Sequence, residues 1–296
     1  MTGPGREGTA APGTAVVPRI SMEDLLGRYD VLYLDAYGVL IDHSGPLPGA
    51  PELVSHLHAA GKPYLILTND ASRSPETSSR RYEGMGLPIP ANRIVTSGLL
   101  LAGHFAANGL IGARCAVLGT GDSRDYVSRA GGVLAPVGED AAALVLCDEM
   151  GFPYREHLDA ALTFLYRRLD RGERVHLVLA NPDLVYPAAP GQFGFTAGAM
   201  AILLEAALDL RYPGAEHRFV RLGKPHAPMF EEARRRLDRG RAIMIGDQLG
   251  TDIRGARDFG LHSALVSSGI ARVDELLSGA PVRPTYILES LEVSGA

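Results

Sequence analysis

The chain has 296 residues, of which 46% are hydrophobic and 21% are charged, and its formal net charge is −5. This composition excludes an intrinsically disordered chain and is typical of a globular protein with one or two domains. The acidic balance and the lack of a basic stripe argue against a nucleic-acid partner. Because no apolar run reaches about 18 residues, we expect no membrane partner either.

Two further features of the sequence bear on the cellular compartment and on the N-terminal segment. Cys115 and Cys147 both lie in apolar stretches, which predicts buried free thiols and a cytoplasmic location. Residues 1–20 are rich in Gly, Pro, Ala and Thr and lack the apolar middle of a signal peptide. We therefore expect residues 1–20 to form a disordered tail.

Short apolar runs then alternate with longer patterns of helical spacing. In chain order, the first half predicts strand 31–40, helix 50–61, strand 62–70, helix 74–86, strand 93–97 and a helix ending near Asn108. The pattern continues with strands 113–120 and 142–149, helix 155–172, strand 174–181, helix 198–210, strand 219–223, helix 227–238, strand 241–247, helix 251–259 and strands 262–269 and 285–290.

This alternation predicts the α/β class, with a mostly parallel sheet covered by helices on both faces. The strands are too many for one comfortable sheet, so two α/β units, one inserted into the other, fit better. In such sheets ligands bind outside the carboxyl ends of the strands. Polar side chains that fall at those ends are therefore the candidates for function.

Six polar residues lie at or just beyond predicted strand ends. They are Asp35, Thr68, Asn69, Lys224, Asp247 and Asp252. Taken singly, each has an ordinary structural explanation as a turn residue, a surface lysine or an acidic residue at a helix N-terminus. Their shared position at one edge of a parallel sheet favours a common site.

The chemistry of these side chains is consistent with such a site. Asp35 and Asp247 offer the hard oxygen ligands that suit Mg²⁺. Thr68, Asn69 and Lys224 supply hydrogen-bond donors and one positive charge for phosphate oxygens. Phosphoryl transfer depends chiefly on positioning and charge neutralisation, and a carboxylate nucleophile would form an aspartyl-phosphate.

Four motifs in this order resemble the haloacid dehalogenase (HAD) superfamily of hydrolases, and more narrowly its NagD-like, p-nitrophenylphosphatase-like branch (subfamily IIA). They are "DAYGVL" at 35–40, "LTND" at 67–70, "GKPHAPMF" at 223–230 and "GDQLGTDIRGA" at 246–256. The resemblance implies a three-layer Rossmann-like core at 21–107 and 219–296. It also implies an inserted α/β cap of the C2 type at 108–218.

The resemblance also implies roles for individual residues. Asp35 would be the nucleophile, and Thr68, Asn69 and Lys224 would bind the transferring phosphoryl group. Mg²⁺ would be held by Asp35, Asp247 and the backbone carbonyl of Tyr37, with support from Asp252. Within the cap segment 180–198, substrate selection is expected from Asn181, Asp183 and Tyr186. A small phosphorylated molecule is the expected substrate, and the cap is a candidate surface for a homodimer.

The chain departs from the family pattern at Tyr37, because the phosphatases usually carry a second Asp at this position as acid and base. A phenol with a reference pKa of about 10 does not replace a carboxylate base near neutral pH. Three interpretations stay open. The first is a phosphatase best suited to leaving groups that need no proton, such as aryl phosphates, in which Asp42 or His43 would have to activate water. The second is a metal-independent haloacid dehalogenase, and the third is a weak or non-catalytic phosphate-binding relative.

Overall fold

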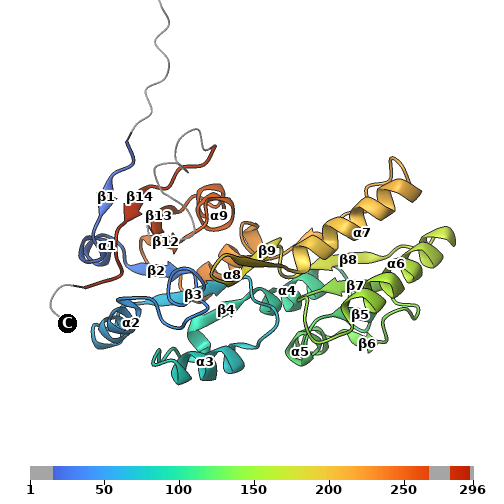
Figure 1. Ribbon diagram of the computed structural model, residues 1–296, viewed down its shortest axis with the longest axis horizontal. Helices are drawn as coiled ribbons and strands as arrows, with labels where there is room; N and C mark the ends of the chain where they lie inside the picture. Colours follow the sequence, from blue (N-terminus) through green and yellow to red (C-terminus); the bar gives the residue numbers. More distant parts are fainter. Residues whose placement is uncertain (1–15, 267–280, 294–296) are drawn as a thin grey trace, which may run out of the picture.

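The computed structural model describes residues 16–266 and 281–293. Residues 1–15 of the predicted tail and residues 267–269 of the strand predicted at 262–269 lie outside these ranges. The described chain forms two parallel sheets with their helices and a separate hairpin, and Figure 1 shows the two sheets in two lobes. No helix in the described ranges has the length and hydropathy that a membrane crossing requires.

The first lobe, which we call the core, is built on a seven-stranded sheet. Its strands, in spatial order, are β1 (Arg19–Ile20), β14 (Tyr286–Leu288), β13 (His262–Val266), β12 (Ala242–Gly246), β2 (Val31–Leu34), β3 (Tyr64–Thr68) and β4 (Ile94–Thr96). Every neighbouring pair is parallel. The α/β class predicted from the alternation of apolar runs is thus confirmed.

Helices cover both faces of the core sheet, as β2 illustrates. Leu32 and Leu34 pack into one apolar cluster, while Val31 and Tyr33 pack into another on the opposite face. The first face is covered by α1 (Met22–Arg28), α2 (Ala50–Ala59) and α3 (Pro75–Gly84), and the second by α4 (Leu100–Ala107), α8 (Ala227–Arg236) and α9 (Arg254–Asp258). This gives the three layers expected of the core.

The second lobe, which we call the cap, is built on a five-stranded parallel sheet. Its strands, in spatial order, are β11 (Val220–Arg221), β8 (His176–Leu179), β7 (Ala143–Leu146), β5 (Arg114–Leu118) and β6 (Val133–Ala135). Helices α6 (Tyr154–Asp170) and α7 (Ala197–Arg211) cover one face. Helix α5 (Gly121–Arg129) packs on the other face, within an apolar cluster that continues into the core.

Helices α1 and α5 and strand β6 were not predicted, and two further segments differ from our expectation. The predicted tail ends in strand β1, because Arg19 and Ile20 pair with β14. The cap segment 180–198 contains a two-stranded antiparallel hairpin, β9 (Val185–Ala189) and β10 (Gln192–Phe195), which Figure 1 places between the two lobes. The division of the chain into core and cap at residues 108 and 218 stays a prediction.

Candidate active site

The carboxyl ends of three adjacent core strands meet at one edge of the sheet. The parallel pairing sets Leu34 of β2 beside Ile245 of β12 and Ile66 of β3, so these strands end together. Asp35 follows β2, Thr68 is the last residue of β3, and Asp247 follows β12. The register of the sheet therefore assembles side chains that are distant in the sequence.

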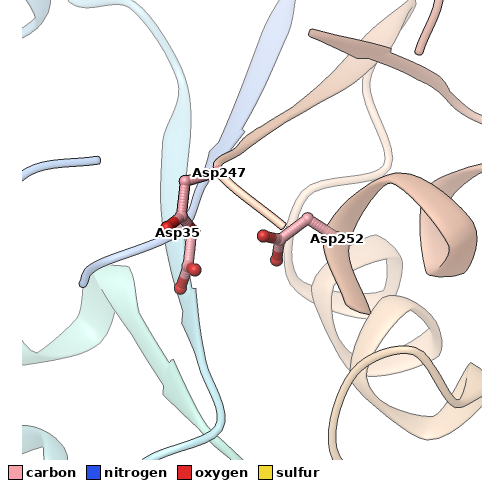
Figure 2. Close-up of side chains that lie close together, drawn as sticks. All are labelled: Asp35, Asp247 and Asp252. Carbon is pink, nitrogen blue, oxygen red and sulfur yellow. The ribbon is translucent and has the colours of Figure 1, made fainter. Parts of the chain in front are cut away.

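Three carboxylates form a buried cluster at this edge. Asp35, Asp247 and Asp252 each offer an oxygen within 4.8 Å of the others, and Figure 2 shows Asp252 facing the other two. Space for the cluster depends on glycine, since a Cβ at Gly38 would lie 2.2 Å from Asp247 Oδ2. Gly38 also has a φ of +87°, a conformation that favours glycine.

Lys224 provides the positive charge within this cluster. Its Nζ lies 2.7 Å from Asp35 Oδ1 and 2.8 Å from Asp252 Oδ1, and the side chain is buried. Burial alone would lower the pKa of Lys224, but Asp252 and Asp35 outweigh it and raise that pKa, so the ammonium stays charged. The amide of Ala36 also donates to Asp35 Oδ1, at 2.7 Å, so both contacts fall on the same oxygen.

The cluster carries more negative charge than one lysine balances. Burial, with Asp252 adding to it and Lys224 opposing it, raises the pKa of Asp35 to about 7. Burial, with the charges of Asp35 and Asp252, raises the pKa of Asp247 to about 8. Asp247 Oδ1 is buried and has no hydrogen-bond partner among the described residues. An orphaned oxygen among hard carboxylate ligands fits a divalent cation, which would neutralise the excess charge.

Asn69 connects the core to the cap through both ends of its amide. Its Nδ2 donates to Lys224 O and to Asp183 Oδ1, each at 2.9 Å, and its Oδ1 accepts from Lys224 N at 2.7 Å. The side chain has room because position 223 is glycine, where a Cβ would lie 2.5 Å from Asn69 Oδ1. Asn69 thus holds the lysine backbone and the cap loop together.

The three residues predicted for substrate selection line the same hollow as Asp35 and Lys224, with a volume of about 380 Å³. Asn181 Oδ1 accepts from Asp183 N at 3.0 Å, so this side chain shapes the loop. Burial, opposed by Asn69 and Lys224, raises the pKa of Asp183 to about 6. The ring of Tyr186 lies over Gly194, where a Cβ would be 2.4 Å away.

Tyr37 lies at the rim of the hollow and reaches the cap. Its hydroxyl donates to the carbonyl of Pro187 in β9 at 2.9 Å. Burial and the charge of Asp42 raise the pKa of the Tyr37 hydroxyl, which makes the phenol a weaker acid and leaves less phenolate to act as a base. Asp42 and His43 are the two candidates for the activation of water. Asp42 Oδ1 accepts hydrogen bonds from the amide and the hydroxyl of Ser44, and His43 Nδ1 lies 3.8 Å from Asp42 Oδ2.

The structure adds a group of charged residues that the sequence did not single out. Asp148 and Glu149 follow β7. Asp70 forms an ion pair with Arg73, with 3.0 Å between Asp70 Oδ2 and Arg73 Nη1. All four residues line the same hollow as Asp35. Burial, with Glu149 adding to it, raises the pKa of Asp148 to about 7. The rule that identified Asp35, a carboxylate at the carboxyl end of a buried parallel strand, would also have found Asp148, two residues beyond β7 in the cap sheet.

Comparisons with known proteins identify the family of the chain. Family models described as haloacid dehalogenase-like hydrolase and HAD-hydrolase-like match residues 32–132 and 221–294. The dihydroxyacetone phosphatase of Corynebacterium glutamicum is 29% identical over 88% of this chain and 90% of its own length.

Two solved structures are similar over most of this chain. A possible sugar phosphatase of the HAD superfamily from Cytophaga hutchinsonii has a TM-score of 0.81 and 32% identity, covering 94% of this chain and 100% of its own. A glycerol phosphate phosphatase from Mycobacterium tuberculosis, solved with calcium, has a TM-score of 0.76 and 28% identity, covering 90% and 75%. The chain therefore belongs to the haloacid dehalogenase-like hydrolases, within their phosphatase branch, as its four motifs predicted.

Proposed function

We propose that the protein is a Mg²⁺-dependent phosphatase of small phosphorylated metabolites that works through an aspartyl-phosphate at Asp35. The arrangement around Asp35 carries this proposal. Lys224 and the amide of Ala36 both contact Oδ1, and no hydrogen bond within the described ranges occupies Oδ2. Because Asp35 lines the hollow, Oδ2 is the oxygen available to attack phosphorus.

The acid cluster would hold the metal. Asp35, Asp247 and the backbone carbonyl of Tyr37 are the proposed ligands. Asp252 would support the site through its contact with Lys224. When bound, a divalent cation lowers the repulsion between the carboxylate nucleophile and the phosphate oxygens. The calcium in the M. tuberculosis structure supports a cation site in a relative, and Mg²⁺ is the hard ion that best suits phosphoryl transfer.

The reaction would proceed in two displacements. Asp35 Oδ2 forms a bond to phosphorus as the bond between phosphorus and the leaving oxygen breaks. Water then attacks the same phosphorus, the bond to Asp35 breaks, and inorganic phosphate leaves. Lys224 would offset charge on the phosphoryl group throughout, and the Thr68 hydroxyl, at the end of β3, would donate to it.

The leaving group sets the requirement for a proton. Aryl oxygens such as 4-nitrophenolate depart without one, whereas an alkyl oxygen needs an acid. Three of the similar proteins are named for small aliphatic phosphates, namely dihydroxyacetone phosphate, a possible sugar phosphate and glycerol phosphate. We infer that the same substrate class is bound here, with slower turnover of alkyl phosphates because Tyr37 stands in place of the usual Asp.

An activity screen with one nucleophile variant tests the proposal. The protein with Mg²⁺ is expected to release phosphate from 4-nitrophenyl phosphate, glycerol 3-phosphate and dihydroxyacetone phosphate. Asp35→Asn is expected to lower the rate by about a thousandfold or more, since the amide cannot form the aspartyl-phosphate. Asp125→Asn makes the same chemical change on the exposed face of α5 and is the matched control. Halide release from 2-chloropropionate without metal, or tight binding of these phosphates without turnover, would contradict the proposal.

The oligomeric state and the cellular location are separate proposals. A homodimer through the cap would give, by sedimentation equilibrium, a molecular mass of twice that of the monomer, and a monomer at micromolar concentration would contradict it. A cytoplasmic location is expected from the two buried thiols, Cys115 and Cys147, which suit a reducing compartment.

A further inference from the structure

The backbone around Tyr37 is held in a fixed position by the core. The residues that follow it, 39–41, are buried in the core, and Gly38 N donates to Ile41 O at 2.8 Å to close the turn. Tyr37 therefore projects from a rigid base directly beside Asp35. Its hydroxyl crosses to the cap and donates to Pro187 O at 2.9 Å.

The hairpin lies at the other end of this hydrogen bond. Strands β9 and β10 pair only with each other among the described strands. Phe193 and Phe195 are 62% and 69% exposed, and no residue of 184–195 belongs to an apolar cluster of the described chain. The base of the hairpin is tied by Thr196, whose hydroxyl donates to Asp183 O at 2.6 Å. The hairpin thus lacks a packed face that would fix its position.

The two residues joined by this hydrogen bond, Tyr37 and Pro187, line two hollows of the protein. Tyr37 and Pro187 line the hollow of about 380 Å³ that holds Asp35 and Lys224. They also line a second hollow of about 260 Å³, bounded by Asp247 and Phe193 among others. The bond therefore lies in the wall between the two hollows and holds the hairpin against the rim of the first.

We propose that Tyr37 is a positioning residue that latches the β9–β10 hairpin over the substrate hollow through its hydroxyl, and is not the acid that protonates the leaving group. This inference rests on the proposed phosphatase function for its kinetic consequence, but the latch itself concerns only core and cap. In its bonded state the phenolic proton is engaged by Pro187 O, so a leaving oxygen could receive it only after the bond breaks. The hairpin carries Tyr186 and Pro187 into the wall of the hollow, so the latch defines the space for the substrate.

The test is Tyr37→Phe, which keeps the ring and removes only the hydroxyl. Hydrogen exchange of the amides in 185–195 is expected to accelerate about two- to tenfold, as the loss of one hydrogen bond predicts. With Mg²⁺, KM is expected to rise by a similar factor for 4-nitrophenyl phosphate and for glycerol 3-phosphate, with little change in kcat. The matched control is Tyr166→Phe, which removes a hydroxyl that donates to Ala207 O at 2.8 Å inside the cap. This control should leave hairpin exchange and both KM values unchanged.

The outcomes separate the latch from the proposed function. Unchanged exchange of 185–195 in Tyr37→Phe would overturn the latch even if the enzyme is an active phosphatase. Faster exchange with unchanged KM would overturn the positioning role. A loss of kcat confined to glycerol 3-phosphate, with unchanged exchange, would identify the phenol as the proton donor and overturn the proposal. If the wild-type chain lacks phosphatase activity, the exchange measurement still decides whether the latch exists.

Discussion

Helix α5 and the β9–β10 hairpin both join the cap to the core, but they do so in different ways. Thr120, Ser123 and Tyr126 of the cap donate to the carbonyls of Ser72, Ala71 and Arg73, and the amide of Ser74 donates to Asp122. We call these contacts the α5 joint. The hairpin, by contrast, reaches the core through the hydroxyl of Tyr37.

Burial separates the two connections further. Ser123 and Tyr126 of the joint are almost fully buried, and the Tyr126 ring lies so close to Gly98 that a Cβ there would be 2.3 Å away. In the hairpin, by contrast, the side chains of Val185, Phe193 and Phe195 are more than half exposed. The joint is thus built like a protein interior, and the hairpin like a surface loop. The difference indicates that the joint fixes the cap on the core, while the hairpin adjusts the wall of the substrate hollow.

The largest effect is expected at the α5 joint. Tyr126→Ala removes a buried ring and leaves Thr96 Oγ1, 2.6 Å from the hydroxyl, without this partner. The free energy of unfolding should fall by about 3–5 kcal/mol, the usual cost of deleting a large buried aromatic ring. Urea unfolding measures it, and Tyr126→Phe, which loses only the hydroxyl, should cost about 1 kcal/mol. A loss below 1 kcal/mol for the alanine variant would mean that the joint does not fix the cap.

The next largest effect on stability is expected from the acid cluster of Asp35, Asp247 and Asp252. Asp247 lines the hollow beside the hairpin and lies outside the α5 joint. The pKa values of Asp35 and Asp247 rise from 3.8 to about 7 and about 8 on folding. Between these limits the folded chain binds more protons than the unfolded chain, so these groups make the metal-free protein less stable as the pH rises from about 4 to 8.

A divalent cation competes with those protons, so its stabilisation should grow with pH. At a Mg²⁺ concentration of about 100 times Kd, the free energy of unfolding at pH 8 should rise by about 2.7 kcal/mol over that in EDTA, and by less at pH 5. Thermal unfolding at both pH values measures this. Asp247→Asn should lose most of the Mg²⁺ response, whereas Tyr126→Phe, at the joint, should keep it. An equal Mg²⁺ response in Asp247→Asn would place the cation elsewhere.

A smaller effect is expected when the latch is exchanged for an acid. Tyr37→Asp should raise kcat on glycerol 3-phosphate by about tenfold or more, because an alkyl leaving group gains a proton donor. The gain on 4-nitrophenyl phosphate should be smaller, and KM should rise for both substrates because the bond to Pro187 is lost. Tyr37→Asn, which fills the same space without an acid, should raise KM alone. Equal gains in kcat on both substrates would contradict the leaving-group argument.

The sequence predicted the acid cluster better than it predicted the α5 joint or the contact of the hairpin. Asp35, Thr68 and Asp247 could be placed together because parallel strands carry their carboxyl ends to one edge, and β2, β3 and β12 are neighbours. Apolar runs mark such buried strands clearly. Lys224 was placed through its motif, and its contact with Asp35 at 2.7 Å agrees with the expected pocket.

The α5 joint and the contact between Tyr37 and the hairpin were not predicted, for physical reasons. Helix α5 is mostly polar, and its burial depends on residues near Ala71 and Gly98, which only the fold brings close. In the hairpin, Pro187, Pro190 and Gly191 interrupt the alternation that marks a strand. The bond from Tyr37 to Pro187 spans 150 positions, and no local pattern reports a contact of that separation.

The smallest effect is expected on the outer face of the hairpin. Phe193→Ser and Phe195→Ser replace side chains that are 62% and 69% exposed, so each should change the free energy of unfolding by about 0.5 kcal/mol or less. Urea unfolding of both variants measures this. Phe193 lines the second hollow beside Asp247 and Phe195 does not, so any change in KM should appear only for Phe193. A loss above 1 kcal/mol for either variant would show that the hairpin is packed as firmly as the α5 joint, and the distinction between a fixed joint and an adjustable wall would fail.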